Sequence, residues 1–277
     1  MVAHDDQTLE QELQVALALA NKAGAEAWRI QKGGKLGVEL KDGDEPVTVA
    51  DRLASEMIVA GLTEAFPSDQ LISEELTPAE SALGSQRLWL IDPIDGTKDF
   101  IIGSDGFAVM IGLCIDGRPK VGVVHMPAQD RTYWATPKGA FVKVGDNISP
   151  LQVSNIASST EARLVASKSH RSDHVDRIKA ELGIKDELNI ASVGAKLGLI
   201  AMAVRDLYVN PASKTKAWDT CGPEAILVRA GGKLTDLLGR PIDYTRELKH
   251  QHGLVASNGL IHDDVVARLA PMFQHLI

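Results

Sequence analysis

The sequence has little cysteine, no excess of positive charge and no long hydrophobic run, and each of these shortages excludes a class of protein. Its two cysteines, Cys114 and Cys221, are too few for a disulfide framework or a zinc knuckle, and they fit a reducing compartment. The formal net charge of -8 would repel polyanions over most of the surface, which argues against extended nucleic-acid binding but leaves room for a local basic pocket. A small phosphorylated substrate therefore fits the charge better than DNA or RNA does.

Apolar segments are short throughout the chain. None reaches the roughly 18 uninterrupted apolar residues of a membrane span, and residues 1–6 lack the basic and then apolar order of a targeting signal. We therefore expect no membrane contact and a cytoplasmic location. The hydrophobic content of 44% over 277 residues still supports a large core, in one large domain or two smaller ones.

The hydrophobic pattern divides the chain into two parts. Residues 9–30 are rich in Ala and Leu and predict an amphipathic helix, whereas residues 108–144 alternate as antiparallel strands do. After residue 150, short strands alternate with helices. We therefore expect an α+β part over 1–150 and an α/β part over 151–277. Further expected elements are a helix at 52–66, strands at 36–40, 71–73 and 88–91, and a hairpin turn at Asp116 and Gly117.

The most informative segment is residues 89–97, an apolar run that stops in two carboxylates, a glycine and a hydroxyl. A short strand would carry this run into the core and leave Asp92 and Asp95 at its end. Pro93 biases Asp92 toward an extended conformation, so the chain turns and both carboxylates can reach one side of the loop. Together with the exposed Ile94 carbonyl, they would begin an oxygen-only site for Mg²⁺ or Mn²⁺.

The glycine and the hydroxyl of the same segment favour an anion beside that cation. Gly96 would let a phosphate approach the backbone, and the amides after Thr97 would cradle it if a helix begins there. The alternative is a turn in which Asp92 and Asp95 only cap backbone amides, as Asp beside Pro and Gly commonly does. The segment alone does not decide between the two.

Four further acids stand at the ends of predicted elements. Glu74 and Glu75 follow an apolar strand, where adjacent carboxylates repel unless a cation or solvent separates them. Asp219 stands at the start of a helix, and the local sequence favours an N-cap role for it. Asp51 follows Thr48 by three residues, which is a capping-box pattern. Taken locally, each of these acids has an ordinary structural explanation.

Together, these residues resemble the three signatures of the lithium-sensitive, Mg²⁺-dependent inositol monophosphatase superfamily. The signatures are Glu74-Glu75, residues 92–97, and Trp218-Asp219 followed by Gly231-Gly232. Their order and spacing agree over nearly the whole chain. Residues 216–227 and 231–236 most resemble the 3'(2'),5'-bisphosphate nucleotidase branch, which removes the 3'-phosphate from adenosine 3',5'-bisphosphate. The resemblance implies a layered αβαβα sandwich in which an α+β first half packs against an α/β second half.

The resemblance also implies a role for each acid. The metal ligands would be Glu74, Asp92, Asp95, Asp219 and the Ile94 carbonyl. Asp92 would bridge two cations, while Glu75 would lie behind the ligands. The expected cofactor is two or three Mg²⁺ ions, with Mn²⁺ as a possible substitute and Li⁺ as an inhibitor.

Asp51 and Thr97 resemble the pair that orients and deprotonates the attacking water in this superfamily. A metal lowers the pKa of that water, Thr97 relays the proton toward Asp51, and in-line attack on phosphorus expels the sugar hydroxyl. A capping role for Asp51 is compatible with this, since one helix start can serve both purposes.

Substrate recognition is expected in the second half of the chain. Ser167 and His170 lie between a predicted strand and a helix, where α/β proteins commonly bind ligands, and they resemble the nucleotide loop of the branch. His170 alone would more often be a surface histidine. Ser192 and Lys196 resemble a second binding loop, and Lys196 suits a phosphate, although an exposed lysine at a helix start is the alternative. The family usually has glycine where Ser192 stands.

One position separates neighbouring branches. Inositol monophosphatases typically place a hydroxyl-binding glutamate seven residues before the Asp of the Trp-Asp motif, and here that position is Ala212. Lys214 and Lys216 nearby suit a second phosphate, although a solvated loop explains them equally well. Three functions stay in view: a bisphosphate nucleotidase, a phosphatase of inositol or another sugar monophosphate, and a regulatory protein that binds RNA polymerase or RNA. A monomer and a homodimer are both compatible with the resemblance.

Overall fold

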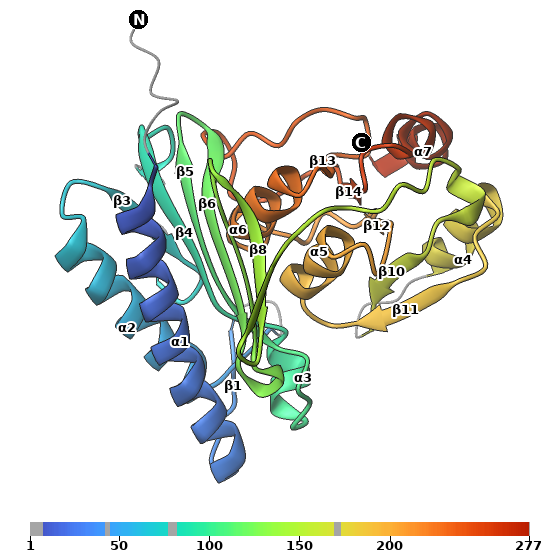
Figure 1. The fold of residues 1–277 in the computed structure, drawn as a ribbon. Coiled ribbons are helices and arrows are strands. Elements are labelled where there is room, and N and C mark those ends of the chain that lie inside the picture. The colour runs from blue at the N-terminus through green and yellow to red at the C-terminus, as the bar shows by residue number, and fades with distance from the viewer. Residues whose placement is uncertain (1–7, 42–44, 77–81, 169–172, 277) are drawn as a thin grey trace, which may run out of the picture.

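Two large sheets and their helices form the molecule (Figure 1). The computed structural model describes residues 8–41, 45–76, 82–168 and 173–276. The first half contains α1 (Glu10–Gly33), β1 (Glu39–Leu40), β2 (Pro46–Val47), α2 (Val49–Ala65), β3 (Gln70–Ser73), β4 (Arg87–Asp95), α3 (Thr97–Ile101), β5 (Ala108–Ile115), β6 (Arg118–Met126), η3 (Pro127–Gln129), β7 (Arg131–Thr136), β8 (Gly139–Val144) and β9 (Asn147–Pro150). The second half contains η4 (Ser159–Glu161), β10 (Leu164–Ser167), α4 (Asp173–Leu182), β11 (Glu187–Ile190), α5 (Val193–Ala201), β12 (Leu207–Asn210), α6 (Ala217–Arg229), β13 (Lys233–Thr235), β14 (Leu254–Ser257), α7 (His262–Leu269) and η5 (Ala270–Leu276).

The first sheet has seven strands in the order β3-β4-β5-β6-β7-β8-β9. Only β3 and β4 run parallel, and every other neighbouring pair is antiparallel. The hairpin between β5 and β6 turns at Asp116 and Gly117, whose φ angles are 50° and 76°. Positive φ at both central residues is the requirement of a tight type I′ turn, so the expected hairpin is confirmed.

Both faces of the first sheet are buried because its strands are apolar on both sides. Leu88 and Leu90 of β4 face one core cluster, while Trp89 and Ile91 face the other. Helices α1 and α2 cover the face that carries Trp89, and they lie on one side of the sheet in Figure 1. The alternation therefore places a helical layer against each face.

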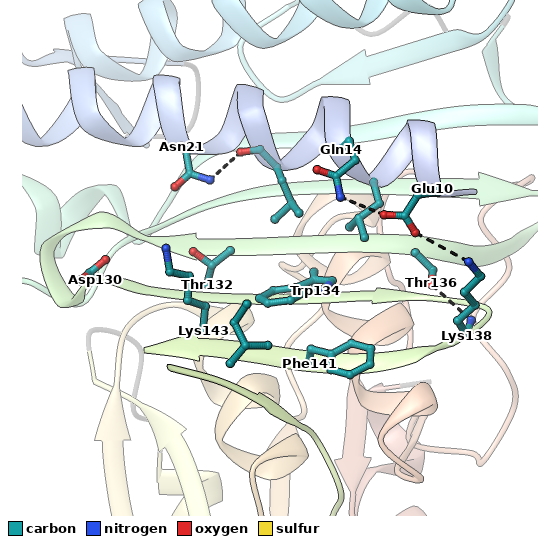
Figure 2. Close-up of a pocket in the computed structure, with 13 residues that line it drawn as sticks. Glu10, Gln14, Asn21, Asp130, Thr132, Trp134, Thr136, Lys138, Phe141 and Lys143 are labelled. Atoms are coloured by element: carbon teal, nitrogen blue, oxygen red, sulfur yellow. Dashed lines mark hydrogen bonds and ion pairs between the residues drawn. The ribbon is translucent and has the colours of Figure 1, made fainter. Parts of the chain in front are cut away.

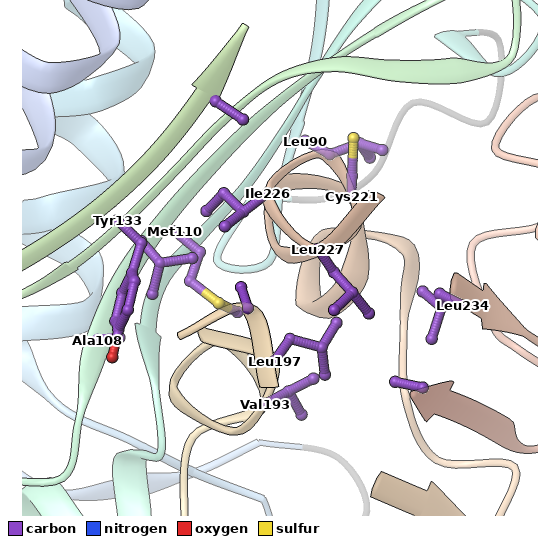
Figure 3. Packing of buried hydrophobic residues seen from close by; sticks show 14 of the residues in the cluster. Leu90, Ala108, Met110, Tyr133, Val193, Leu197, Cys221, Ile226, Leu227 and Leu234 are labelled. Carbon is purple, nitrogen blue, oxygen red and sulfur yellow. The ribbon is translucent and has the colours of Figure 1, made fainter. Parts of the chain in front are cut away.

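Helices α5 and α6 fill the space between the two sheets (Figure 3). Their side chains Leu197 and Ile226 pack in the same cluster as Met110 of the first sheet. Close approach of α6 requires glycine, because a Cβ at Gly122 would lie only 2.1 Å from the carbonyl oxygen of Gly222. This contact fixes the start of α6, and with it Asp219, against the first sheet.

The second sheet has the strand order β11-β10-β12-β14-β13, and β10 runs parallel to both of its neighbours. Its outer face packs on α4 and α7 through a separate cluster. This cluster joins Leu164 and Ala166 of β10 to Ile178 of α4 and Val265 of α7. The layers therefore run helix, sheet, helix, sheet, helix, which confirms the predicted sandwich. No helix in the described residues is both long and apolar enough to span a membrane.

The main difference from the expected elements lies at residues 36–40. Only Glu39 and Leu40 form a strand, and both are exposed. Gly37 has a φ of 56°, which turns the chain inside the expected segment. At the other end, β4 continues past residue 91 to Asp95 with an irregularity between Asp92 and Asp95. The predicted strand at 88–91 is therefore confirmed but too short.

Candidate active site

A pocket of about 830 Å³ brings together the acids singled out in the sequence. Its lining combines the end of β4 and the start of α3 with β10, α5, β12 and the start of α6. Residues from both halves of the chain therefore face the same space. The four acids among the predicted metal ligands, Glu74, Asp92, Asp95 and Asp219, all belong to this lining.

The parallel register of β3 and β4 places Glu74 beside Asp92. Ser73 pairs with Ile91, and the amide of Glu74 donates to the Ile91 carbonyl at 3.1 Å. Glu74 follows Ser73 and Asp92 follows Ile91, so both acids come directly after the last pair of the two strands. Because parallel strands end at the same edge of a sheet, two acids distant in sequence meet there.

Asp92 and Asp95 are held by hydrogen bonds that use one oxygen of each carboxylate. Asp92 is 2% exposed, and its Oδ1 accepts from the amide of Ile94 at 3.0 Å. Asp95 Oδ2 accepts from the Ser192 hydroxyl at 2.6 Å and from the amide of Gly194 at 2.9 Å. The start of α5 in the second half thus positions an acid of the first half.

Asp219 comes from α6 and also uses one oxygen structurally. Its Oδ2 accepts from the backbone amide of Lys216 at 2.7 Å. Lys216 is the N-cap residue and Asp219 stands at the third helical position, so the local N-cap interpretation of Asp219 was wrong. A carboxylate at that position reaches back to the N-cap amide, which is one half of a capping box. The side chain can still face the pocket.

The acids raise one another's pKa. Burial raises the pKa of Asp92 well above its usual range, and the charges of Glu74, Asp95 and Asp219 raise it further. Burial, followed by the charge of Glu75, raises the pKa of Glu74 to about 7 against the opposing effect of Lys41. Four carboxylates that share a buried pocket need positive charge, which a divalent cation would supply.

The donor set fits a hard cation such as Mg²⁺, because it consists of carboxylate and carbonyl oxygens. In the described residues, no three acidic, histidine or cysteine side chains are drawn together as a closed metal cluster. Glu74 has a cationic neighbour in Lys41, whose Nζ lies 3.0 Å from Glu74 Oε1 and 2.7 Å from Glu75 Oε1. Glu74, Asp92, Asp95, Asp219 and the Ile94 carbonyl are the groups that would hold the metal.

Asp51 and Thr97 are in contact, as the proposed proton relay requires. Thr97 Oγ1 lies 3.1 Å from Asp51 Oδ1 and 3.1 Å from the Ile94 carbonyl oxygen. The other oxygen of Asp51 accepts from the amide and the hydroxyl of Thr48, so the capping box is confirmed. Burial raises the pKa of Asp51, which favours proton uptake by this carboxylate.

The turn after the acids is tight and leads directly into a helix. Gly96 has a φ of 98° and is followed at once by helix α3, which begins at Thr97. Both residues line the pocket. A left-handed conformation at this point explains the glycine, and the helix start presents backbone amides without partners inside the helix.

The predicted substrate residues have different surroundings. Ser167 and Lys196 line the pocket. Lys196 is fully buried; its Nζ donates to the Ala191 carbonyl at 2.5 Å, and burial lowers its pKa to about 8. Ser192 is also fully buried, and besides bonding Asp95 its hydroxyl accepts from the amide of Ala195 at 3.0 Å. His170 lies outside the described residues.

Sequence analysis missed several residues of the site. Lys41 was not among the predicted site residues, and nothing in its local sequence indicates that it would bridge Glu74 and Glu75. Tyr208 and Thr215 also line the pocket. The one available signal was topological, because Tyr208 lies on a strand that runs parallel to the strand ending in Ser167.

A second pocket, of about 490 Å³, lies between α1 and strands β7 and β8 (Figure 2). Trp134 and Phe141 stack in it with ring centroids 6.0 Å apart, and Glu10 faces Lys138. Its acids, Glu10 and Asp130, come from different elements and do not form a cluster like that of the first pocket. The first pocket is therefore the candidate active site.

Known proteins resemble this chain over nearly its whole length. The model of the inositol monophosphatase family matches residues 8–272. The histidinol-phosphatase of Mycobacterium tuberculosis is 34% identical over 97% of this chain and 99% of its own length. The 3'(2'),5'-bisphosphate nucleotidase CysQ of Salmonella typhimurium is 34% identical over 84% of this chain and 94% of its own length.

A solved structure has a similar fold. The Thermotoga maritima IMPase superposes with a TM-score of 0.80 at 27% identity, covering 96% of this chain and 99% of that protein. The family match spans nearly the entire chain, including all the acids described above. The chain therefore belongs to the inositol monophosphatase family.

Proposed function

We propose that this phosphatase removes the 3'-phosphate from adenosine 3',5'-bisphosphate, giving AMP and inorganic phosphate. The observation that carries the proposal is the charge of the pocket beyond the metal ligands. Its lining contains the lysines Lys196, Lys214 and Lys216. A substrate with a second phosphate would bring negative charge to these ammonium groups, whereas a substrate with one phosphate, held at the acids, would not.

The acids and the hydroxyl relay account for the chemical step. A divalent cation held by the acids would neutralise phosphate charge and lower the pKa of water. Thr97 Oγ1 donates to Asp51 and accepts from the attacking water, so Asp51 is the final proton acceptor. Gly96 and the start of α3 receive the phosphate. Water attacks phosphorus in line with the sugar oxygen, which leaves as the P–O bond breaks.

A phosphatase of histidinol phosphate is the second candidate, because the Mycobacterium tuberculosis histidinol-phosphatase matches nearly the full length of this chain. Histidinol phosphate carries an ammonium group, which needs an acid for recognition. Apart from the predicted metal ligands, the acids of the lining are Glu45 and Asp99. Asp99 is paired with Lys168 at 3.2 Å, and Glu45 is exposed. The pocket therefore favours an anionic leaving group over a cationic one.

Inositol phosphate fits less well for a different reason. The position that would carry a hydroxyl-binding glutamate is Ala212, which lines the pocket and offers no acceptor on its side chain. Polyol hydroxyls would lose a hydrogen-bond acceptor there. Ser167, Lys196 and His170 remain the predicted nucleotide contacts. Ser192 is also a predicted substrate contact. Because its hydroxyl already donates to Asp95, it would contact the substrate through its backbone or act through Asp95.

Phosphate release from adenosine 3',5'-bisphosphate, histidinol phosphate and inositol 1-phosphate, measured on one preparation, tests the proposal. We expect Mg²⁺-dependent release that is fastest from the bisphosphate and is inhibited by Li⁺. Faster release from histidinol phosphate would overturn the substrate assignment and leave the metal site intact. Equal rates with Mg²⁺ and with EDTA would overturn the metal mechanism itself.

A further inference from the structure

Buried polar atoms without partners are concentrated in the active-site pocket. In the described part of the chain, the buried side-chain atoms that lack a hydrogen-bond partner are Arg131 Nε, His174 Nδ1, Arg205 Nε, Tyr208 OH, Thr215 Oγ1 and His252 Nδ1. His174, Tyr208 and Thr215 all line the pocket. Because folded chains satisfy nearly all buried polar groups, such a concentration marks groups that await a ligand.

Tyr208 is the most deeply buried of the three, with 1% of its surface exposed. It stands in the middle of β12, where it pairs with Val165 of β10, so its backbone is fixed. Ser167 and Asn210 lie close enough to influence the phenol, but no described residue makes a hydrogen bond of normal geometry to it. Lys196 Nζ lies 5.1 Å from the centre of the ring.

Thr215 is 6% exposed and stands between Lys214 and Lys216. Its carbonyl accepts from the amide of His250 at 3.0 Å, which ties this segment to the rest of the second half. The hydroxyl is therefore without a partner although its backbone is held in place. A loosely packed loop does not explain the missing bond.

The groups around the two hydroxyls indicate what kind of ligand they would bind. Lys196, Lys214 and Lys216 are ammonium groups that only donate hydrogen bonds. The acceptors near Tyr208 are Asp95 and Asp219, which are predicted to hold the metal, so a ribose hydroxyl would compete with the cation for them. A phosphate group has oxygens that accept only, and it can take several donors at once.

We propose that the hydroxyls of Tyr208 and Thr215 donate to the phosphate that the enzyme does not cleave. In adenosine 3',5'-bisphosphate this is the 5'-phosphate, which stays on the AMP product. The inference rests on the proposed function, since it names the residues that distinguish a bisphosphate from a monophosphate. The two hydroxyls are specificity-determining groups that bind the retained phosphate beside the lysines.

Binding of AMP in the presence of EDTA tests this without the metal and without turnover. Tyr208→Phe and Thr215→Val each remove a hydroxyl and keep the shape of the side chain. We expect each to weaken AMP binding by about tenfold, the usual effect of one hydrogen bond to a charged group. The affinity for adenosine, which lacks the phosphate, should fall by less than about twofold. The Tm of each variant should equal or exceed that of the wild type, because an unsatisfied buried group has been removed.

Tyr133→Phe is the matched control, since Tyr133 is a fully buried tyrosine of β7 that does not line the active-site pocket. It should bind AMP as the wild type does. Unchanged AMP binding in both test variants would overturn the inference, and so would equal losses for AMP and adenosine. Failure of the wild type to bind AMP with EDTA would overturn it too.

Hydrolysis by the wild type separates this inference from the proposed function. If the wild type releases phosphate from adenosine 3',5'-bisphosphate while both variants bind AMP normally, the function stands and the subsite is wrong. If the wild type does not hydrolyse the bisphosphate but both variants bind AMP more weakly than the wild type, the substrate assignment is wrong and the phosphate subsite stands.

Discussion

The two walls of the active-site pocket are built from different parts of the molecule. The acids Glu74, Asp92 and Asp95 stand at the edge of the first sheet, where strand register and backbone amides fix them. Lys214 and Lys216, by contrast, lie in a connection of the second half that leads from β12 into α6. Metal binding would therefore depend mainly on the sheet edge, while recognition would depend on a connecting segment. That segment also touches the acids, since the amide of Lys216 donates to Asp219 Oδ2.

The largest expected effect comes from the acid wall. Asp92→Asn removes a charge from the centre of the predicted metal set and keeps the shape of the side chain. We expect phosphate release to fall by about 10³-fold or more, since the metal provides several kcal/mol of transition-state stabilisation. The Tm without metal should not fall, because a buried carboxylate that its neighbours repel has been neutralised.

Phosphate release and thermal unfolding of the same Asp92→Asn sample check this. Loss of folding together with normal activity per folded molecule would contradict the assignment of Asp92. The wild type with EDTA provides the metal-free reference.

Lys196→Met tests the lysine that α5 adds to the pocket, because it removes the ammonium group and retains an apolar side chain of similar length. We expect kcat/KM for adenosine 3',5'-bisphosphate to fall by about 10- to 100-fold, as for other charged hydrogen bonds to a phosphate. The kcat/KM for adenosine 3'-phosphate should fall clearly less than that for the bisphosphate. Steady-state kinetics with both nucleotides measure the ratio, and equal losses would remove Lys196 from specificity.

Gly122→Ala tests how the two walls are joined. The new methyl group would overlap the Gly222 carbonyl and push α6, which carries Asp219, away from the first sheet. We expect a loss of about 1–3 kcal/mol in the free energy of unfolding and a lower kcat. Gly33→Ala is the matched control, because nothing lies within 4 Å of a Cβ at that helical position. Equal stability of the two variants in urea unfolding would contradict the packing argument.

The smallest expected effect is the pH dependence of stabilisation by Mg²⁺. Burial raises the pKa of Glu74 from 4.5 to about 7, so this group costs stability progressively as the pH rises from about 4.5 to about 7, and the full cost remains above pH 7. A cation that binds the ionised acids should therefore raise the Tm more at about pH 8 than at about pH 5.5. Thermal unfolding with Mg²⁺ and with EDTA at both pH values gives the difference, and a larger shift at the lower pH would contradict this account.

The sequence predicted the layers and the acids well for a physical reason. Apolar alternation defines the two faces of strands such as β4, and the signature acids stand directly at the ends of these strands. The family resemblance then grouped Glu74, Asp92 and Asp219, which no local pattern would bring together. In the structure, all of these line one pocket.

The contacts that depend on tertiary placement could not be predicted from the sequence. Lys41 comes from a loop after a two-residue strand, and its bonds to Glu74 and Glu75 depend on where that loop folds back. Ser192 was predicted to contact the substrate, yet its hydroxyl bonds Asp95 across the two halves. The absence of a partner for Thr215 is likewise a property of packing and not of sequence.

The ratio of kcat/KM for adenosine 3',5'-bisphosphate to that for histidinol phosphate, measured with Mg²⁺ in wild type and Lys196→Met, tests the central claim most directly. The account predicts a ratio of about 10² or more in the wild type, which falls by at least about tenfold in the variant. A wild-type ratio below one, or a ratio that Lys196→Met leaves unchanged, would contradict it.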